Sequence, residues 1–458
     1  MRADRRTAPR RAPSRWWAPT LLFLLLGPAR GADLFDIPAT HPPRVVTADY
    51  FGTHFHRLDH AVGGFPATAW PGDVVGSVRL WDSSTRWADL EPTPGRFDFA
   101  RLDALVDQAR AHHANVSLVL GSPPPWASAR PNEAGPYGPG SAAEPRDLEQ
   151  WDRYLSAIMR RYKGRISQYE LWNEPYFSDF PADRQQPGAF FSGSAASMVE
   201  LARRARAAID REDPQATLLT PGFVGATNRL DLFLKAGGAR YVDGVAYHFY
   251  VEDDAEFVRL CADVRSVMLR NGLGSRPLFN TESGFAIRGS EGQPLAEGQT
   301  PIDRRRAAVL LARSLILGAW LGVDRFYQYA WDNGRMGMLL PDGRTETDSL
   351  RAYAAVRRWL LGTTLQGCRS LVGGVVRCEG ARGDDHLFIA WHEGPGDGGT
   401  FTMPRPFRAV SIEDAVSGPM PVDRDASRSL SLPADGSPVA VWAGSDATAR
   451  HTPVAQAR

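Results

Sequence analysis

The chain has 458 residues, of which 43% are hydrophobic and 10% aromatic, so it can bury a large core and is not disordered over most of its length. Its formal net charge is +1, but residues 1–31 contain seven Arg and one Asp, so their removal would leave −5. Neither value favours binding to nucleic acid or to an anionic membrane. The length is sufficient for two or three domains, or for one large α/β barrel with an additional domain.

Residues 1–31 have the organisation of a secretory signal. A basic segment, MRADRRTAPRRAPSRWW, precedes the apolar run APTLLFLLL and a small-x-small cleavage site at Ala29-Arg30-Gly31. A membrane anchor is the alternative, but the apolar part of 16–26 is much shorter than the roughly 20 residues of a spanning helix. We therefore expect export to the periplasm or the medium, without stable insertion into a membrane.

Eight β-rich runs alternate with helical patterns between residues 47 and 361, and they predict a parallel sheet with crossover helices. The predicted strands are 47–55, 77–81, 115–121, 166–172, 217–222, 244–250, 277–283 and 325–331. Eight β/α units indicate an α/β fold of the (β/α)8 TIM-barrel type, which we assign to residues 32–362. A doubly wound open sheet is the competing fold, but no Gly-rich phosphate-binding loop follows any predicted strand.

After Gly362 the pattern changes to short alternating runs separated by Gly, Pro, Asp and Ser, which predict an antiparallel, sandwich-like β module over residues 363–445. Residues 33–47 are a candidate additional strand for this module, and 446–458 are expected to form a flexible tail.

The three cysteines lack the spacing of a zinc site. If 372–374 form a three-residue hairpin loop, Cys368 and Cys378 lie opposite each other and can form a disulfide, whereas a two-residue turn would put them out of register. Cys261 lies in a helical run and is expected to be a buried thiol.

Two carboxylates stand where predicted barrel strands end. Glu174 follows the strand 166–172 in the sequence LWNEP, and Glu282 lies in FNTES at the end of 277–283. The carboxyl ends of barrel strands form one mouth, where catalytic residues gather. A pair of carboxylates is what glycosidic cleavage requires, because one protonates the leaving oxygen and the other attacks the anomeric carbon or activates water.

The LWNEP and FNTESG segments resemble those of clan A glycoside hydrolases, the retaining (β/α)8 barrels, over roughly residues 45–361. The pattern GTHFH, SPPPW, WNEP, YHFY, TESG and YAWDN, with the trailing β module, is most similar to glycoside hydrolase family 39 and its bacterial exopolysaccharide-cleaving relatives. The resemblance implies that Glu174 is the general acid/base and Glu282 the nucleophile. It also implies that Asn173 binds the sugar 2-OH and that no cofactor is needed.

Further site residues follow from the same resemblance or from their place at strand ends. His248 and Tyr250 match a His and a Tyr of the clan, the tyrosine hydroxyl bonding the nucleophile, although a packing pair is the alternative. Trp331 resembles the tryptophan under the attacked sugar, and Arg79 is a candidate to orient Glu282 or to form a structural ion pair. The remaining substrate-binding candidates are His54, His56 and, in a long loop, Trp126.

His54 and His56 are alternatively metal ligands, but no acidic residue stands at a diagnostic spacing, so we predict no metal site. The leading hypothesis is an exported, retaining β-glycosidase acting on a poly- or oligosaccharide, with an exopolysaccharide as one candidate. The alternatives are a transglycosylase, a catalytically inactive sugar-binding barrel, and a barrel enzyme that uses phosphate or a cofactor. The last is disfavoured because Lys163 and Lys235, the only lysines, are not at strand ends. The sequence sets neither the sugar nor the oligomeric state.

Overall fold

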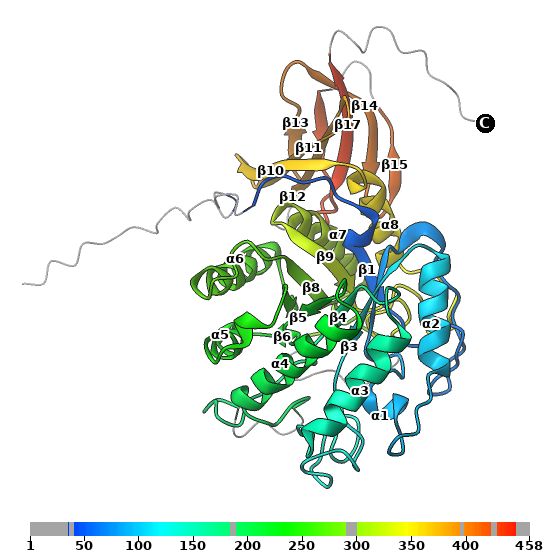
Figure 1. Cartoon of the computed structure of the whole chain (residues 1–458). Helices are drawn as coiled ribbons and strands as arrows, with labels where there is room; N and C mark the ends of the chain where they lie inside the picture. The colour runs from blue at the N-terminus through cyan, green and yellow to red at the C-terminus, as the bar shows by residue number, and fades with distance from the viewer. Residues whose placement is uncertain are drawn as a thin grey trace, which may run out of the picture.

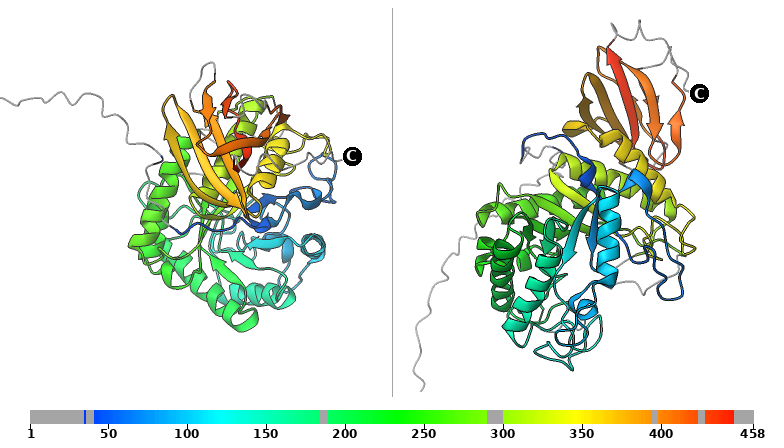
Figure 2. Two further views of the ribbon diagram at one scale, coloured as in Figure 1. Left: turned by 90° about the horizontal axis from the view of Figure 1, so that it is seen from above. Right: turned by 45° about the vertical axis from the view of Figure 1, so that its right-hand side comes forward.

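A computed structural model describes residues 35, 41–183, 189–289, 300–393, 398–422 and 428–445. The predicted signal at 1–31 and the predicted tail at 446–458 lie outside the described residues. Within them, the chain forms a barrel with a β module stacked against its outer helices (Figures 1 and 2). Among the described helices, none combines the length and the apolar character needed to cross a bilayer.

Nine parallel strands make the barrel sheet, in the order β5-β4-β3-β2-β1-β9-β8-β7-β6. They are β1 (Phe51–His54), β2 (Ser77–Leu80), β3 (Asn115–Val119), β4 (Gln168–Glu170), β5 (Thr217–Leu219), β6 (Phe223–Val224), β7 (Val245–His248), β8 (Leu278–Ser283) and β9 (Val323–Gln328). A parallel bridge between Leu219 and Gly244 joins β5 to the start of β7 and closes the sheet. The predicted fold class is therefore confirmed: seven of the eight predicted strands contain an observed one, and 325–331 overlaps β9.

Seven long helices surround the sheet, preceded by the single turn α1 (Trp87–Leu90). They are α2 (Ala100–Ala111), α3 (Leu148–Arg161), α4 (Ala195–Glu212), α5 (Asn228–Lys235), α6 (Asp254–Arg270), α7 (Arg304–Trp320) and α8 (Asp348–Leu360). Several begin at an Asp or Ser whose side chain accepts a hydrogen bond from a backbone N–H of the first turn, as Asp147 does for α3. The apolar face of each helix then packs on the sheet.

The first β/α unit differs from the prediction. Residues 55–76, all of which the structure describes, contain the 3₁₀ turn η2 (Gly72–Val74) but no α-helix between β1 and β2. This segment reads FHRLDHAVGGFPATAWPGDVVG, in which Pro and Gly interrupt any helical repeat. The expectation of eight complete β/α units is therefore wrong in this unit.

The C-terminal module is an antiparallel sheet in the order β10-β11-β12-β17-β14-β15, with a separate pair of strands, β13 and β16. The strands are β10 (Thr364–Leu371), β11 (Val375–Arg382), β12 (Asp385–His392), β13 (Thr400–Thr402), β14 (Phe407–Asp414), β15 (Gly418–Met420), β16 (Ser429–Ser431) and β17 (Val439–Ser445). One apolar cluster fills the space between the large sheet and β13–β16. The candidate strand within 33–47 contributes a single bridge, from Val45 to Thr364.

The hairpin of β10 and β11 has the predicted register. Cys368 pairs with Cys378 across the two strands, and the two residues form a disulfide with their Cα atoms 4.0 Å apart. Cys261, on α6, is the buried free thiol that the sequence predicts.

The other face of the module packs on the barrel, so that one hydrophobic core runs from the barrel into β10, β11 and β12. Helix α7 lies between the two, and buried residues occur on all its faces. Buried polar contacts cross the same boundary: Arg313 of α7 donates to Asp254 of α6, and Trp391 of β12 donates to the same carboxylate. The module is therefore a structural part of the barrel protein, packed away from the strand ends.

Candidate active site

Glu174 owes its position to an unusual backbone at the end of β4. Trp172 and Glu174 adopt φ values of 141° and 38°, which side-chain-bearing residues rarely adopt. The backbone is held there because Glu174 N–H donates to Gly222 O at 2.8 Å and the Trp172 indole donates to Phe190 O at 2.7 Å. Such local strain clusters at functional sites. It explains why the strand ends in Trp-Asn-Glu-Pro and turns the carboxylate into the mouth.

Glu282, near the end of β8, receives two hydrogen bonds from groups that favour its ionised form. Arg79 of β2 donates from Nη1 to Oε2 at 2.8 Å, and the Tyr250 hydroxyl donates to Oε1 at 2.7 Å. Both contacts are the ones that the sequence predicts for Arg79 and Tyr250. A guanidinium and a phenol directed at one carboxylate hold it as an oriented anion.

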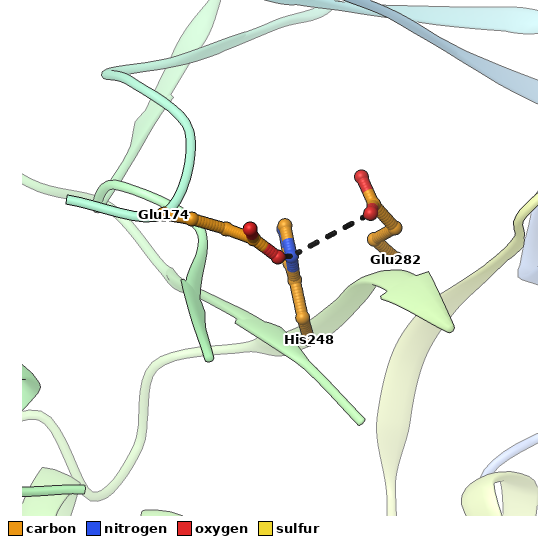
Figure 3. A group of neighbouring side chains, drawn as sticks. All are labelled: Glu174, His248 and Glu282. Carbon is orange, nitrogen blue, oxygen red and sulfur yellow. Dashed lines mark hydrogen bonds and ion pairs between the residues drawn. The ribbon is translucent and has the colours of Figure 1, made fainter. Parts of the chain in front are cut away.

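His248 lies between the two glutamates, whose side chains extend toward it from β8 and from the segment after β4 (Figure 3). Burial lowers the pKa of His248 to about 4, so the ring is neutral at neutral pH. Its Nε2 is 3.4 Å from Arg79 Nη2, which can only donate, and its Nδ1 is 2.7 Å from Glu174 Oε1. The proton of the ring therefore resides on Nδ1 and is donated to Glu174 Oε1, which leaves the second carboxyl oxygen of Glu174 for substrate.

The two carboxyl groups share one protonation equilibrium. Burial raises the pKa of Glu174 to about 7, and burial also raises the pKa of Glu282 to about 7 against the opposing effects of His248 and Arg79. One oxygen of each group lies within 4.8 Å of the other, so the pair titrates together and retains one proton near neutral pH. Arg79 and Tyr250 contact Glu282 and not Glu174, so that proton resides on Glu174.

Glu170, the last residue of β4, is a site residue that the sequence analysis missed. Its side chain is fully buried and accepts from Arg79 at both oxygens, Nε to Oε2 at 2.8 Å and Nη2 to Oε1 at 2.6 Å. This two-point contact fixes the plane of the guanidinium and compensates its charge. The available signal was a carboxylate at an inward-facing position of an otherwise apolar strand.

Asn173 is buried beside the same guanidinium, with its Oδ1 accepting from Arg79 Nη2 at 2.7 Å. Because Arg79 can only donate, the Asn173 atom that faces it must be the carbonyl oxygen. The NH₂ group of the amide therefore points away from Arg79. The amide is thus oriented as a donor at the position where the sequence resemblance implies a bond to the sugar 2-OH.

A second group of side chains surrounds Tyr329, directly after β9. The rings of His54 and His56 lie 5.0 Å and 5.1 Å from the Tyr329 ring, and its hydroxyl donates to Asp82 at 2.8 Å. Tyr137, from the loop after β3, donates to the other oxygen of Asp82 at 2.5 Å. Asp82 directly follows the predicted strand 77–81, so the strand-end rule that identified Glu174 could have identified it too.

The other two predicted substrate-binding residues lie outside these hydrogen-bonded groups. Trp331 packs near Phe55 and lines a cavity of about 600 Å³ formed by the β1–β2 loop, α8 and residues 413–418 of the module. Trp126 packs against Trp87 and donates its indole N–H to Glu91 O at 3.1 Å. Their contacts with substrate stay predictions.

Glu174, His248 and Glu282 together offer three ligand atoms within 4.8 Å, a group that could hold a metal ion. The fit is poor, because the oxygens of Glu282 already accept from Arg79 and Tyr250 and the Nδ1 proton of His248 is directed at Glu174. The arrangement is better suited to proton transfer and nucleophilic attack than to metal binding.

The chain is similar to known glycoside hydrolases in sequence over one segment and in fold over most of its length. A family model described as β-galactosidase, of glycoside hydrolase family 42, matches residues 77–168, which include Arg79 and end before Glu174. A family 39 glycoside hydrolase from Bacteroides cellulosilyticus WH2 is similar in structure with a TM-score of 0.62, at 17% sequence identity over 87% of this chain and 82% of that one.

Two further solved structures are similar at low identity. A glucosidase from Croceicoccus marinus has a TM-score of 0.55 at 19% identity, covering 86% of this chain and 82% of its own. A family 30 xylanase from Clostridium acetobutylicum has a TM-score of 0.58 at 15% identity, covering 88% of this chain and 98% of its own.

The chain resembles the clan A glycoside hydrolases. At these identities the solved structures establish the barrel fold. The family match adds sequence similarity over the segment that contains β2, β3 and the start of β4. Together they support a glycosidase of the clan A type.

Proposed function

We propose that the protein is an exported glycosidase that hydrolyses β-linked poly- or oligosaccharides with retention of configuration. The observation that carries the proposal is the pair Glu174 and Glu282, with one oxygen of each within 4.8 Å of the other. Retaining glycosidases place their carboxyl groups about 5–5.5 Å apart, whereas inverting enzymes need about 6.5–9.5 Å to admit water between them. The close spacing favours direct attack by a carboxylate.

In the first step, Glu282 attacks the anomeric carbon while Glu174 gives its proton to the departing glycosidic oxygen. The C–O bond to the leaving group breaks, an ester bond forms between the sugar and Glu282, and the negative charge of Glu282 is lost. Tyr250 and Arg79 orient the attacking carboxylate, and His248 holds Oε1 of Glu174 so that the other oxygen faces the leaving group.

In the second step, the ionised Glu174 accepts a proton from water, whose oxygen displaces Glu282 from the sugar. Esterification of Glu282 removes the negative charge that kept the proton on Glu174, so the pKa of Glu174 falls and the residue becomes a base. If a sugar hydroxyl replaces water in this step, the same residues perform transglycosylation. The donors assembled around Glu282 argue against an inactive sugar-binding barrel.

Export is supported by the signal-like pattern of 1–31 and by the disulfide, a bond that persists mainly in oxidising compartments. N-terminal sequencing of exported protein should give a chain that starts near Gly31. A chain that still began at Met1 would contradict this part of the proposal.

The chemistry is tested with the mature chain on a panel of aryl β-glycosides and bacterial exopolysaccharides. Glu282→Ala should abolish turnover, and azide should restore an inverted glycosyl azide. Glu174→Ala should still cleave activated aryl glycosides in the first step and give a retained azide product. Glu149→Ala, which removes an exposed carboxylate on α3, is the control for folding and should keep the parent rate.

Product stereochemistry, followed by NMR in the parent and both variants, decides the mechanism. Inversion by the parent enzyme, or near-parent rates in either active-site variant, would overturn the assignment. Absence of turnover on the whole panel, with sugar binding intact, would favour the inactive barrel.

A further inference from the structure

A third carboxylate stands at the mouth of the barrel, outside the Glu174–Glu282 pair. Asp82 follows β2, and its oxygens accept separately from Tyr137 at 2.5 Å and Tyr329 at 2.8 Å. Asp82 and Tyr329 follow the ends of β2 and β9, and Tyr137 lies in the long loop after β3, so three segments at the mouth of the barrel converge on this carboxylate. Burial and Asp82 both raise the pKa of Tyr137 and of Tyr329, which keeps the phenols protonated as donors.

Side chains around this group carry polar nitrogens that lack a partner among the described residues. They are Nδ1 of His54, Nε2 of His56 and Nε1 of Trp81. His54 and His56 flank Tyr329, and the ring of Trp81 lies 5.6 Å from that of Tyr137. Buried polar atoms are normally hydrogen-bonded, so several orphaned nitrogens around one carboxylate indicate a place for a polyhydroxylated ligand.

The protonation of His54 can be deduced from its contacts. Its side chain is 1% exposed, and burial, assisted by Arg79, lowers its pKa well below the usual value, so the ring is neutral. Its Nε2 is 3.0 Å from the carbonyl oxygen of Thr281, which can only accept, so the proton resides on Nε2. The orphaned Nδ1 is therefore an acceptor, suited to a hydroxyl group.

The charge of Asp82 reaches the reacting groups. Burial is the main cause of the raised pKa of Glu174 and of Glu282, and the negative charge of Asp82 adds to the rise in both. Among the described residues, Arg79 is the one cation that contacts the pair Glu174 and Glu282. The carboxylate of Glu170 already compensates its charge. With Glu282 and Asp82 both ionised, the space beside the attacked carbon has a net negative field.

We propose that Asp82, held by Tyr137 and Tyr329, forms a wall of the subsite for the attacked sugar, binds its hydroxyls, and excludes uronic acids in favour of uncharged residues. The inference rests on the proposed glycosidase function and deepens it by naming the class of sugar. A carboxylate on the substrate would lie near two ionised carboxylates, and the cation that contacts the pair among the described residues, Arg79, is already bonded to Glu170 and Glu282. Repulsion between like charges in a poorly solvated site lowers the affinity for such a substrate by about 100-fold or more.

Several charged and titratable groups bond to Asp82, feel its charge or lie around its two phenol donors. Asp82 accepts from Tyr137 and Tyr329, and its charge acts on Arg79, Glu174 and Glu282. His54, His56 and Tyr250 lie around Tyr329, and Arg86 stacks on Tyr137. Removing the negative charge of Asp82 favours ionisation of both glutamates, so both limbs of the pH–rate profile should move to lower pH. A residue that only supported the fold would not shift both limbs together.

The test uses matched 4-nitrophenyl β-glycosides that differ only at C6: glucoside with glucuronide, and galactoside with galacturonide. For the parent, kcat/KM for the neutral member should exceed that for the acid by at least about 100-fold. Asp82→Asn should reduce this ratio about tenfold or more and raise KM for the neutral glycoside about tenfold, because one good hydrogen bond is lost. Asp107→Asn, in an exposed ion pair with Arg165, removes the same charge elsewhere and should leave ratio and profile unchanged.

The outcomes separate the inference from the function on which it rests. Turnover of uronides as fast as of neutral glycosides, or an unchanged ratio and pH profile in Asp82→Asn, would overturn the inference and leave the glycosidase function intact. Absence of turnover on every glycoside, and on exopolysaccharides, would overturn both. A loss of folding in Asp82→Asn, seen by circular dichroism, would move the comparison to Tyr329→Phe, which removes one donor to Asp82 and should also raise KM and shift both limbs.

Discussion

Tyr250 contributes a single hydrogen bond to Glu282, and its removal tests how the site separates the two carboxyl groups. The donor stabilises ionised Glu282, so Tyr250→Phe should raise the pKa of Glu282 by about one unit. Because Glu282 must be ionised to attack, the acid limb of the kcat/KM profile should move to higher pH. Since burial already raises the pKa of both glutamates to about 7, activity should be lost from near-neutral pH downward in the variant.

The control for this change lies on β7, just before Tyr250. Tyr247 of β7 donates its hydroxyl to the backbone carbonyl of Gly225 at 2.6 Å instead of to a glutamate, so Tyr247→Phe should leave the acid limb in place. Equal shifts in the two variants, or no shift in Tyr250→Phe, would show that the Tyr250 hydroxyl does not set the ionisation of Glu282.

The sequence located residues of this site through one rule, that chemistry gathers where barrel strands end. The rule found Glu174 and Glu282 and offered Arg79 as a candidate to orient Glu282 or to form a structural ion pair, and the family resemblance supplied the contact of Tyr250. It missed Glu170, which lies within β4 and acts through Arg79. The direction of a side chain after a strand end is set by backbone turns, so the sequence could not show that Tyr329, and not Trp331, joins the Asp82 group.

At the scale of elements, the short strand β6 could not be predicted from the pattern of hydrophobic residues. A two-residue strand has no periodicity, so residues 223–224 could not be recognised, although they complete the barrel between β5 and β7. The segment before β6 brings Gly222 against the site, where Glu174 N–H donates to its carbonyl. The eight longer strands were predictable because each is a β-branched or aromatic run between turn residues.

Gly222→Ala tests this close approach of backbone to the site. A Cβ at Gly222 would meet Glu170 Oε1 at 2.4 Å and His248 Nε2 at 2.5 Å, both in side chains packed without free space. We expect a loss of stability of about 1–3 kcal/mol and a loss of activity larger than the unfolded fraction explains, because His248 and Arg79 must move. Thermal unfolding and kcat/KM measured on the same sample separate the two effects.

Gly367→Ala is the matched control, since a Cβ at that position, on β10, would meet nothing within 4 Å. It should leave both stability and activity near the parent values. Parent-like activity in Gly222→Ala would mean that the segment before β6 moves without disturbing the catalytic side chains.

At the scale of the whole molecule, the barrel and the C-terminal module share one core, and Arg313 is the polar centre of their boundary. Its guanidinium donates to Asp254, to Gly436 O and to His392 O, and its side chain is only 3% exposed. Because these acceptors come from α6, from the end of β12 and from the loop before β17, Arg313 connects both parts of the chain. We infer that the two parts unfold as one cooperative unit.

Arg313→Ala should therefore destabilise the whole protein. Removing the cation leaves the Asp254 carboxylate buried with only Trp391 as a donor, a loss expected to cost about 3–5 kcal/mol. Calorimetry should show a single transition at lower temperature, coincident with the loss of activity. Arg369→Ala, which breaks an exposed ion pair with Glu379 in the module, should cost under about 1 kcal/mol. Two separate transitions in Arg313→Ala, with activity persisting after the first, would instead show that the module can unfold without the barrel.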